Sequence, residues 1–181
     1  MQVSSEYAVQ MHGIVKTFGP FCALDHVDLD VKKGTVHALL GENGARKSTL
    51  MNILYGLYQA DSGSIYISGK EAHIKDSSTA IRYGIGMVHQ HFMLVDNFTV
   101  LQNVILGSEV TGRFGVLDMG KARKKVQEIA EKYGFRVNLD AKIEDISVGM
   151  QQRVEILKAL YRGIDILILD AAGSPGTRRH R

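Results

Sequence analysis

The feature that most constrains this chain is a glycine-containing turn between an apolar segment and a run of helical periodicity. Residues 41–49 read GENGARKST, and they follow the apolar, β-branched residues 35–40. After the turn, leucine and isoleucine residues recur at the spacing of a helix: Leu50, Ile53, Leu54 and Leu57. Such a turn lets successive backbone N–H groups converge on a phosphate chain, and the helix N-terminus adds the positive end of its dipole. The pattern predicts a strand over 35–40, a phosphate-binding loop and a helix.

Each position of this loop has an expected task. Lys47 would reach the β- and γ-phosphates of a nucleotide, and Ser48 would offer its hydroxyl to Mg²⁺. The other nucleotide-binding positions are Gly41, Asn43, Gly44, Ala45 and Thr49. Arg46 is the one departure, because the pattern G-x-x-x-x-G-K-[ST] has glycine there, where the backbone lies close to phosphate. We expect Arg46 to weaken ATP binding; a glycine turn without a ligand is the alternative.

Composition narrows the class of protein. A chain of 181 residues with 45% hydrophobic content can bury one core. Its single cysteine, Cys22, cannot form an internal disulfide, which favours a reducing compartment. No leader pattern and no long apolar run indicate export or membrane spanning. The net charge of +3 comes from Arg178, Arg179 and Arg181, so the rest of the chain predicts no nucleic-acid partner.

Periodicity predicts alternating layers of strand and helix. Two antiparallel strands are expected between Tyr7 and Val31, separated by Gly19-Pro20, and short strands at 64–68 and 85–89. From 99 to 145 the pattern is helical, most clearly at 121–133. A helix is expected at about 150–161, after Ser147. The apolar run 164–170 predicts a parallel strand buried on both faces.

Four motifs together carry a family resemblance. They are the loop at 41–49, GMVHQHFMLV at 86–95, ISVGMQQR at 146–153, and the strand 166–170. In this order they make the chain, from about Tyr7 to Asp170, resemble an ABC transporter ATP-binding subunit. The resemblance is to the first ATPase half of the fused subunits that serve simple-sugar and nucleoside importers. It implies an α/β P-loop NTPase core with N-terminal antiparallel strands, a helical subdomain at about 95–150, and an incomplete C-terminal end.

The resemblance also implies roles around a bound ATP. Phe18 matches the aromatic residue on which adenine stacks, although an ordinary core or edge phenylalanine is the alternative. Gln90 matches the glutamine beside the metal and the attacking water. Asp170 matches the acid that holds Mg²⁺ through water, so the implied magnesium residues are Ser48, Gln90 and Asp170. His89 and His91 lack the cysteines or acids of a zinc site.

A second set of residues matches the family's signature motif: Ser147, Gly149, Met150 and Gln151, with Val148 in place of the usual glycine. In the family this segment opens a helix that caps the γ-phosphate held by an opposite ATPase. The implied partners are a second, head-to-tail ATP-binding domain and an integral membrane permease, which would meet about residues 95–106. That places the chain in the cytoplasm, at the inner face of the plasma membrane. Ser147 is equally compatible with a plain helix N-cap.

The resemblance ends after Asp170. The family continues with a glutamate that polarises water, but this chain has Ala171, so the expected general base is missing. Residues 171–181 have no apolar periodicity and are expected to form an unrelated, disordered basic tail. A frameshift or splice after Asp170 explains this pattern, and a genuine short homologue is the alternative. Loss of the following strand predicts exposed apolar surface and marginal stability.

Three interpretations therefore remain open from the sequence. The first is an importer ATPase subunit, impaired in hydrolysis by Arg46 and by the missing glutamate. The second is a fragment that binds nucleotide or docks on a permease without hydrolysing ATP. The third is a non-functional gene fragment.

Overall fold

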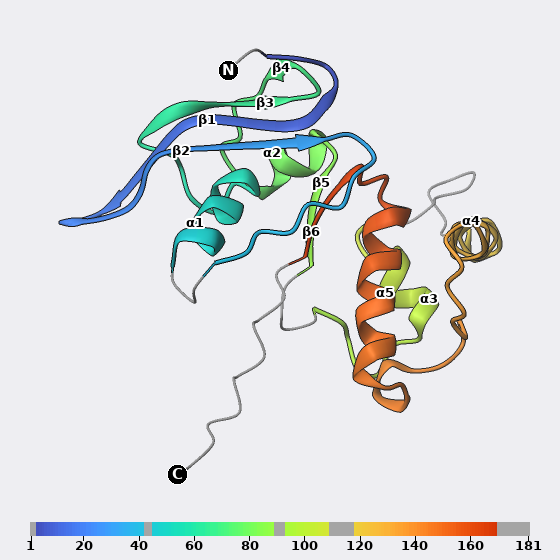
Figure 1. Ribbon diagram of the computed structural model, residues 1–181. Helices are drawn as coiled ribbons and strands as arrows, with labels where there is room; N and C mark the ends of the chain where they lie inside the picture. Colours follow the sequence, from blue (N-terminus) through green and yellow to red (C-terminus); the bar gives the residue numbers. More distant parts are fainter. Residues whose placement is uncertain (1–2, 42–44, 89–92, 109–117, 170–181) are drawn as a thin grey trace, which may run out of the picture. The chain divides into compact units, whose positions relative to one another are not determined.

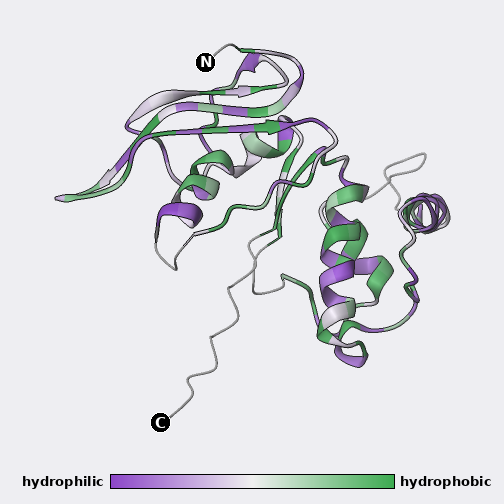
Figure 2. Ribbon diagram, viewed as in Figure 1, coloured by the Kyte–Doolittle hydropathy of each residue, from purple (hydrophilic) through white to green (hydrophobic). Residues whose placement is uncertain are grey.

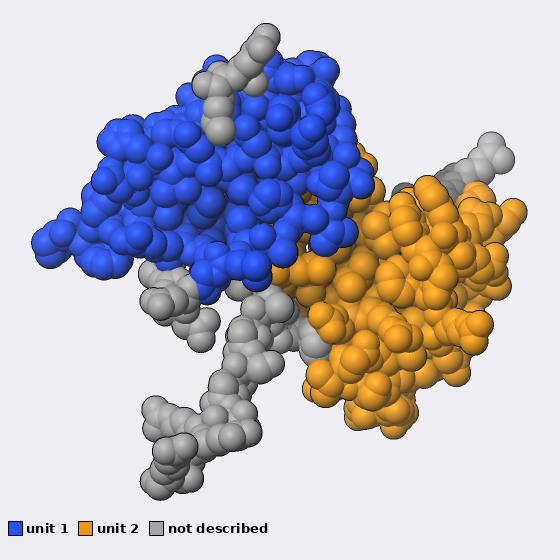
Figure 3. All heavy atoms as spheres, viewed as in Figure 1, with its two compact units in different colours: residues 1–86, 172–181 blue, residues 87–171 orange. Residues whose placement is uncertain are grey.

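The computed structural model describes residues 3–41, 45–88, 93–108 and 118–169. They fall into two compact units, one that runs to Gly86 and one that begins at Met87, coloured separately in Figure 3. Gln90, Asp170, Asn43 and Gly44, together with His89, His91 and the tail, lie outside the described residues.

The first unit is built on an antiparallel sheet, and Figure 1 shows its strands with the helices beneath them. Its elements are β1 (Tyr7–Phe18), β2 (Phe21–Lys32), α1 (Ala45–Leu54), β3 (Ser62–Ile67), β4 (Lys70–Glu71) and α2 (Ser77–Arg82). The strand order is β2-β1-β3-β4, with β1 antiparallel to both β2 and β3. The expected pair of N-terminal antiparallel strands is confirmed, and the hairpin turns at Gly19-Pro20.

The core of the first unit lies where α1 packs against β2. Its buried side chains come from β1, β2, α1, β3 and α2: Val9, Met11, Ile14, Ala23, Leu24, Leu29, Leu50, Ile53, Leu54, Ile67 and Ala80. The predicted helix after the loop is present. It ends at Leu54, so Leu57 lies beyond it and is half exposed.

The strand expected at 64–68 is present but begins two residues earlier. β3 begins at Ser62, and Gly63 lies inside this strand with φ +105°. A Cβ atom at Gly63 would lie 2.7 Å from the carbonyl oxygens of His12 and Gly13. The glycine therefore permits close approach of β3 to β1, at an irregularity in their pairing.

The strand expected over 35–40 is wrong. β2 ends at a turn through Gly34, where the Thr35 hydroxyl donates to the Lys32 carbonyl at 2.8 Å. Residues 35–40 have no strand conformation, and Val36 and Leu40 are 101% and 91% exposed. A strand needs a hydrogen-bonded neighbour, and none of the described strands pairs with this segment. The apolar composition of residues 35–40 is therefore not sufficient to form a strand.

The second unit is mainly helical. Its elements are α3 (Val100–Ile105), α4 (Met119–Lys132), the 3₁₀ turn η2 (Ile143–Asp145), α5 (Val148–Tyr161) and β6 (Ile166–Leu169). The helices predicted at 121–133 and 150–161 are confirmed, each beginning two residues early. Asp118 and Ser147 cap α4 and α5 through their side-chain oxygens.

A cluster of buried residues holds the second unit together, and Figure 2 shows hydrophobic residues along α3 and α5. α5 packs against both α3 and α4. The most buried members are Val100, Val104, Ala122, Val126, Ile143, Val154 and Leu157. α4 has the amphipathic pattern that its sequence predicted, with Ala122, Val126 and Ala130 buried.

The strand predicted at 164–170 is shorter and less buried than expected. It is β6, which pairs with β5 (Ile85–Val88) in a two-stranded sheet. Ile168 is buried, but Leu169 is 54% exposed. Among the described strands β6 has one neighbour, β5. An edge strand cannot be covered as fully as the central strand that its apolar run indicated.

Asp61 lies in the connection between α1 and β3, and it attaches this connection to the end of β1. Its carboxylate accepts hydrogen bonds from the Lys16 ammonium at 2.8 Å and from the Thr17 amide and hydroxyl, both at 2.7 Å. The hydrogen bond from Lys16, followed by those from Thr17, lowers the pKa of Asp61 from 3.8 to about 2. The depressed pKa means that the carboxylate stabilises the fold above pH 3.8, and that this contribution is lost as the pH falls towards 2.

An Asp61→Asn variant should accordingly be less sensitive to acid, because it lacks this titration. We expect its unfolding temperature to fall less steeply between pH 4 and pH 2 than that of the unaltered chain, measured by circular dichroism. Parallel curves for the two proteins would contradict the assignment.

Candidate functional site

The start of α1 is polar and open, while its second half is buried. The first residue of α1 is Ala45, and the Lys47 ammonium donates to the Gly41 carbonyl oxygen at 2.5 Å. Ser48 is exposed, so its hydroxyl is accessible to a ligand, whereas Thr49 is buried. Burial of Leu50 and Ile53 orients the helix so that its first turn stays in solvent.

Electrostatics at this helix end favour an anion. Arg46 and Lys47 both lie in the first turn of α1, which has no acidic residue. Cations at a helix N-terminus oppose the helix dipole, and a bound anion would relieve this unfavourable arrangement. The described residues of the loop therefore fit a phosphate group. The Arg46 side chain is exposed, and its expected crowding of the loop involves residues 42–44, which lie outside the described residues.

Phe18 is not a core residue. It ends β1 and is 40% exposed. The Tyr58 ring meets it edge-on, with centroids 5.3 Å apart and an interplanar angle of 74°. The Lys16 ammonium lies 5.5 Å from the centroid of Phe18. Aromatic edge contacts and cation–π contacts both restrict a ring without covering all of it. An aromatic surface is therefore open to solvent at the end of the hairpin.

The signature-motif residues form the beginning of α5. The Ser147 hydroxyl accepts from the Met150 amide at 3.4 Å, so the N-cap interpretation is confirmed. Gly149 is exposed, and a Cβ atom there would meet nothing within 4 Å. Gln151 donates to the Ile143 carbonyl at 3.2 Å, which fixes η2 against the helix. Met150 is half-buried. Among the described residues, no packing contact within its own unit requires glycine at position 149.

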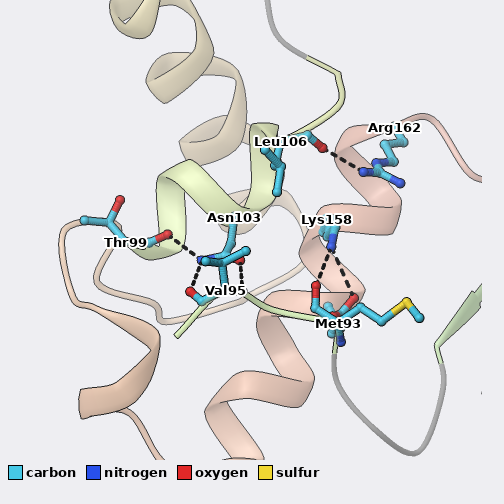
Figure 4. A network of polar contacts seen from close by, with 8 residues as sticks. Met93, Val95, Thr99, Asn103, Leu106, Lys158 and Arg162 are labelled. Atoms are coloured by element: carbon cyan, nitrogen blue, oxygen red, sulfur yellow. Dashed lines mark hydrogen bonds and ion pairs between the residues drawn. The ribbon is translucent and has the colours of Figure 1, made fainter. Parts of the chain in front are cut away.

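A polar network that the sequence did not predict holds the segment after residues 89–92. Figure 4 shows Lys158 of α5 beside Met93, and Asn103 of α3 beside Val95. Glu155 accepts from the Met93 amide at 2.9 Å, and Lys158 donates to the Met93 carbonyl at 3.2 Å. The backbone of Met93 is therefore held on both sides by one helix. Glu155 and Lys158 are three residues apart on α5, and that spacing was the available sequence signal.

Asn103, a buried residue of α3, holds the backbone of Val95. Its amide oxygen accepts from the Val95 amide at 2.7 Å, and its amide nitrogen donates to the carbonyls of Val95 and Thr99, both at 3.1 Å. Near Met93, burial lowers the pKa of Lys158, and the negative charge of Glu155 opposes this shift. The Lys158 ammonium and the Glu155 carboxylate lie 4.0 Å apart, so each charge partly compensates the burial of the other.

Two kinds of feature are absent from the part of the chain that the structure describes. No helix in them is long and apolar enough to cross a membrane. In the same residues, no three or more histidine, cysteine, aspartate or glutamate side chains gather as a metal site.

Glu155 should be needed to protect the Met93 amide from solvent. In a Glu155→Leu variant we expect hydrogen–deuterium exchange at Met93 to accelerate, because the acceptor is gone, while Glu155→Gln retains an oxygen acceptor and most of the protection. Glu128→Leu, which removes an exposed carboxylate from α4, is the matched control. Equal exchange in the Leu and Gln variants would show that Glu155 does not hold this segment.

Comparison with known proteins bears on both units. The family model described as "ABC transporter" matches residues 24–174. The chain is 58% identical over 168 residues to the nucleoside import ATP-binding protein NupA of Lactococcus lactis subsp. cremoris, covering 93% of this chain and 33% of that protein. It is 44% identical over 165 residues to the ribose import ATP-binding protein RbsA of Caldanaerobacter subterraneus subsp. tengcongensis, covering 91% and 33%. The chain spans about a third of the length of these relatives.

Solved structures show the same fold. The crystal structure of a nucleotide-free ATP-binding cassette from an ABC transporter matches with a TM-score of 0.74 at 29% identity, covering 94% of this chain and 72% of that chain. The expected P-loop fold of an ABC ATPase, with an N-terminal antiparallel sheet, is confirmed.

Proposed function

Because the chain belongs to the ABC transporter family, we propose that it is the ATP-binding part of an importer subunit of the nucleoside class. Identity of 58% to a protein named for nucleoside import, against 44% to one named for ribose import, favours nucleosides over sugars. Selectivity for the solute belongs to the permease and to external binding proteins, so sugar import is the second candidate.

ATP with Mg²⁺ is the proposed ligand. The observation that carries the proposal is the open first turn of α1, where Lys47 lies at the Gly41 carbonyl and Ser48 is exposed. Lys47 would exchange the Gly41 oxygen for a phosphate oxygen, and Ser48 would offer its hydroxyl to the metal. Bound Mg²⁺ would supply neutralisation of phosphate charge. Phe18 would stack on the base, and Gln90 and Asp170 are proposed from their sequence positions.

Two protein partners complete the proposal. The exposed start of α5, with Ser147 and Gly149, would face a second ATP-binding domain. Residues 95–106, which follow the segment held by Glu155 and Lys158, would dock on a membrane permease. Docking there would place the chain at the inner face of the plasma membrane.

Hydrolysis by this chain is proposed to be poor. Ala171 follows Asp170 where the resemblance implies a glutamate, and an alanine cannot polarise water. A binding or docking fragment that never hydrolyses ATP is therefore the alternative of a different class. Phosphate release, measured with and without the permease and a second ATP-binding domain, separates the two: stimulated release supports the ATPase, and none supports the fragment.

Lys47→Ala should abolish measurable binding of Mg-ATP in calorimetry, because it removes the ammonium at the open start of α1. Lys124→Ala, which removes one exposed positive charge from α4, should leave the affinity unchanged. Equal affinity of the Lys47→Ala variant and the unaltered chain would exclude the proposed site.

Arg46→Gly should raise the affinity for Mg-ATP by about tenfold, equivalent to about 1.4 kcal/mol, because it restores close backbone approach to phosphate. Glycine in a helix costs about 1 kcal/mol of stability, so binding must be measured directly rather than through thermal shifts. Unchanged affinity would show that Arg46 does not impair the loop.

A further inference from the structure

The connection that leaves α1 holds the Phe18 ring at two points. Tyr58, four residues beyond the end of α1, supplies the edge-on ring contact at 5.3 Å. Asp61, three residues later, binds the ammonium of Lys16, which itself lies 5.5 Å from the Phe18 centroid. Tyr58 and Asp61 both lie outside the β1–β2 hairpin, whereas Lys16 belongs to β1 together with Phe18. The orientation of the ring therefore depends on this connection as well as on the hairpin.

Asp61 attaches to β1 through four hydrogen bonds. Its amide donates to the Val15 carbonyl at 2.8 Å, and its carboxylate accepts from Lys16 and twice from Thr17. Val15, Lys16 and Thr17 are the three residues that precede Phe18. The Lys16 side chain is only 16% exposed, so its stem is packed and its ammonium is restrained. With a pKa lowered to about 2 by Lys16 and Thr17, Asp61 is ionised at neutral pH.

The same connection is attached firmly to α1. The amides of Leu57 and Tyr58 both donate to the Asn52 carbonyl, at 2.8 and 3.3 Å. Gly56 has φ +81°, and a Cβ atom there would lie 2.5 Å from the backbone of Asp76, so the connection passes tightly against its neighbour. α1 carries Lys47 near its other end. A continuous, hydrogen-bonded path therefore runs from the phosphate-binding end of α1 to the exposed ring of Phe18.

We propose that Asp61 is a positioning residue for base recognition, which acts through Lys16 and Thr17 to hold the Phe18 ring at a fixed place relative to α1. Tyr58 assists by restricting rotation of the ring. The inference rests on the proposed function, since it assumes that a nucleotide binds with its base on Phe18. It goes further in assigning part of the base affinity to a carboxylate that touches neither base nor phosphate.

This role predicts a selective defect. A residue that positions the ring should affect ligands that have a base and spare ligands that consist of phosphate alone. A residue that only stabilises the fold should affect both alike. Inorganic tripolyphosphate with Mg²⁺ supplies the phosphates without the base, so the ratio of its dissociation constant to that of Mg-ATP reports the contribution of the base.

The test uses the full chain, with Asp61→Ala and a matched control. Asp28→Ala also removes a carboxylate that accepts from a backbone amide of β1, that of Gly13 at 2.6 Å, but it lies away from Phe18. Calorimetry measures the dissociation constants of Mg-ATP and tripolyphosphate. Stacking of a base on an aromatic ring raises affinity roughly five- to 150-fold. We expect Asp61→Ala to weaken ATP about fivefold and tripolyphosphate less than twofold, with Asp28→Ala unchanged for both.

A double-mutant cycle adds a second criterion. In a Phe18→Leu background, which lacks the stacking ring, Asp61→Ala should cause no further loss of ATP affinity, because both changes remove the same contact. Additive losses overturn the proposal. If Asp61→Ala does not fold, Asp61→Asn serves instead: it keeps an oxygen acceptor for Thr17 but loses the charge facing Lys16, and a smaller selective loss of ATP affinity is expected.

The outcomes separate this inference from the function on which it rests. If the unaltered chain binds neither ligand, the proposed nucleotide site fails and the inference with it. If the chain binds ATP but Asp61→Ala leaves the ratio unchanged, or weakens both ligands equally, the proposed function stands and the positioning role of Asp61 is overturned.

Discussion

The burial of one face of α1 is the constraint on which the candidate site depends. Leu50, Ile53 and Leu54 bury the second half of the helix in the core of the first unit, while Arg46 and Ser48 in its first turn are exposed and Lys47 is half-buried. A helix end is a site for phosphate only if its amides are accessible and its position is fixed. Apolar packing of the second half of α1 fixes the position of the helix.

The second unit uses the same arrangement for a different purpose. α5 buries Val154 and Leu157 between α3 and α4, which leaves its start, capped by Ser147, exposed. Two to three turns after the start, Glu155 and Lys158 hold the backbone of Met93. The helix thus leaves its start exposed and holds the segment that begins at Met93. In both units, therefore, buried apolar side chains fix a helix whose first turn contains exposed residues.

The success of sequence prediction followed the range of the interactions involved. Alternation in residues 27–31 and the amphipathic spacing of residues 121–133 predicted a strand and a helix that the structure contains. The strand predicted over residues 35–40 is absent, since a strand requires a hydrogen-bonded partner that local composition cannot supply. β6 is less buried than its apolar run suggested, for the same reason. The caps were predictable because an N-cap involves residues only three apart, as with Ser147 and Met150.

The sequence alone determined the family of this protein, because four spaced motifs, each with its own chemistry, rarely coincide. It also identified Lys47, Ser48 and Phe18 as candidate nucleotide-binding residues. Only the tertiary structure decided how these residues are held. The attachment of Asp61 to Lys16 and Thr17 joins positions more than forty residues apart, and the contact of Glu155 with Met93 spans 62. Such contacts depend on packing between distant segments, and no local pattern in the chain encodes them.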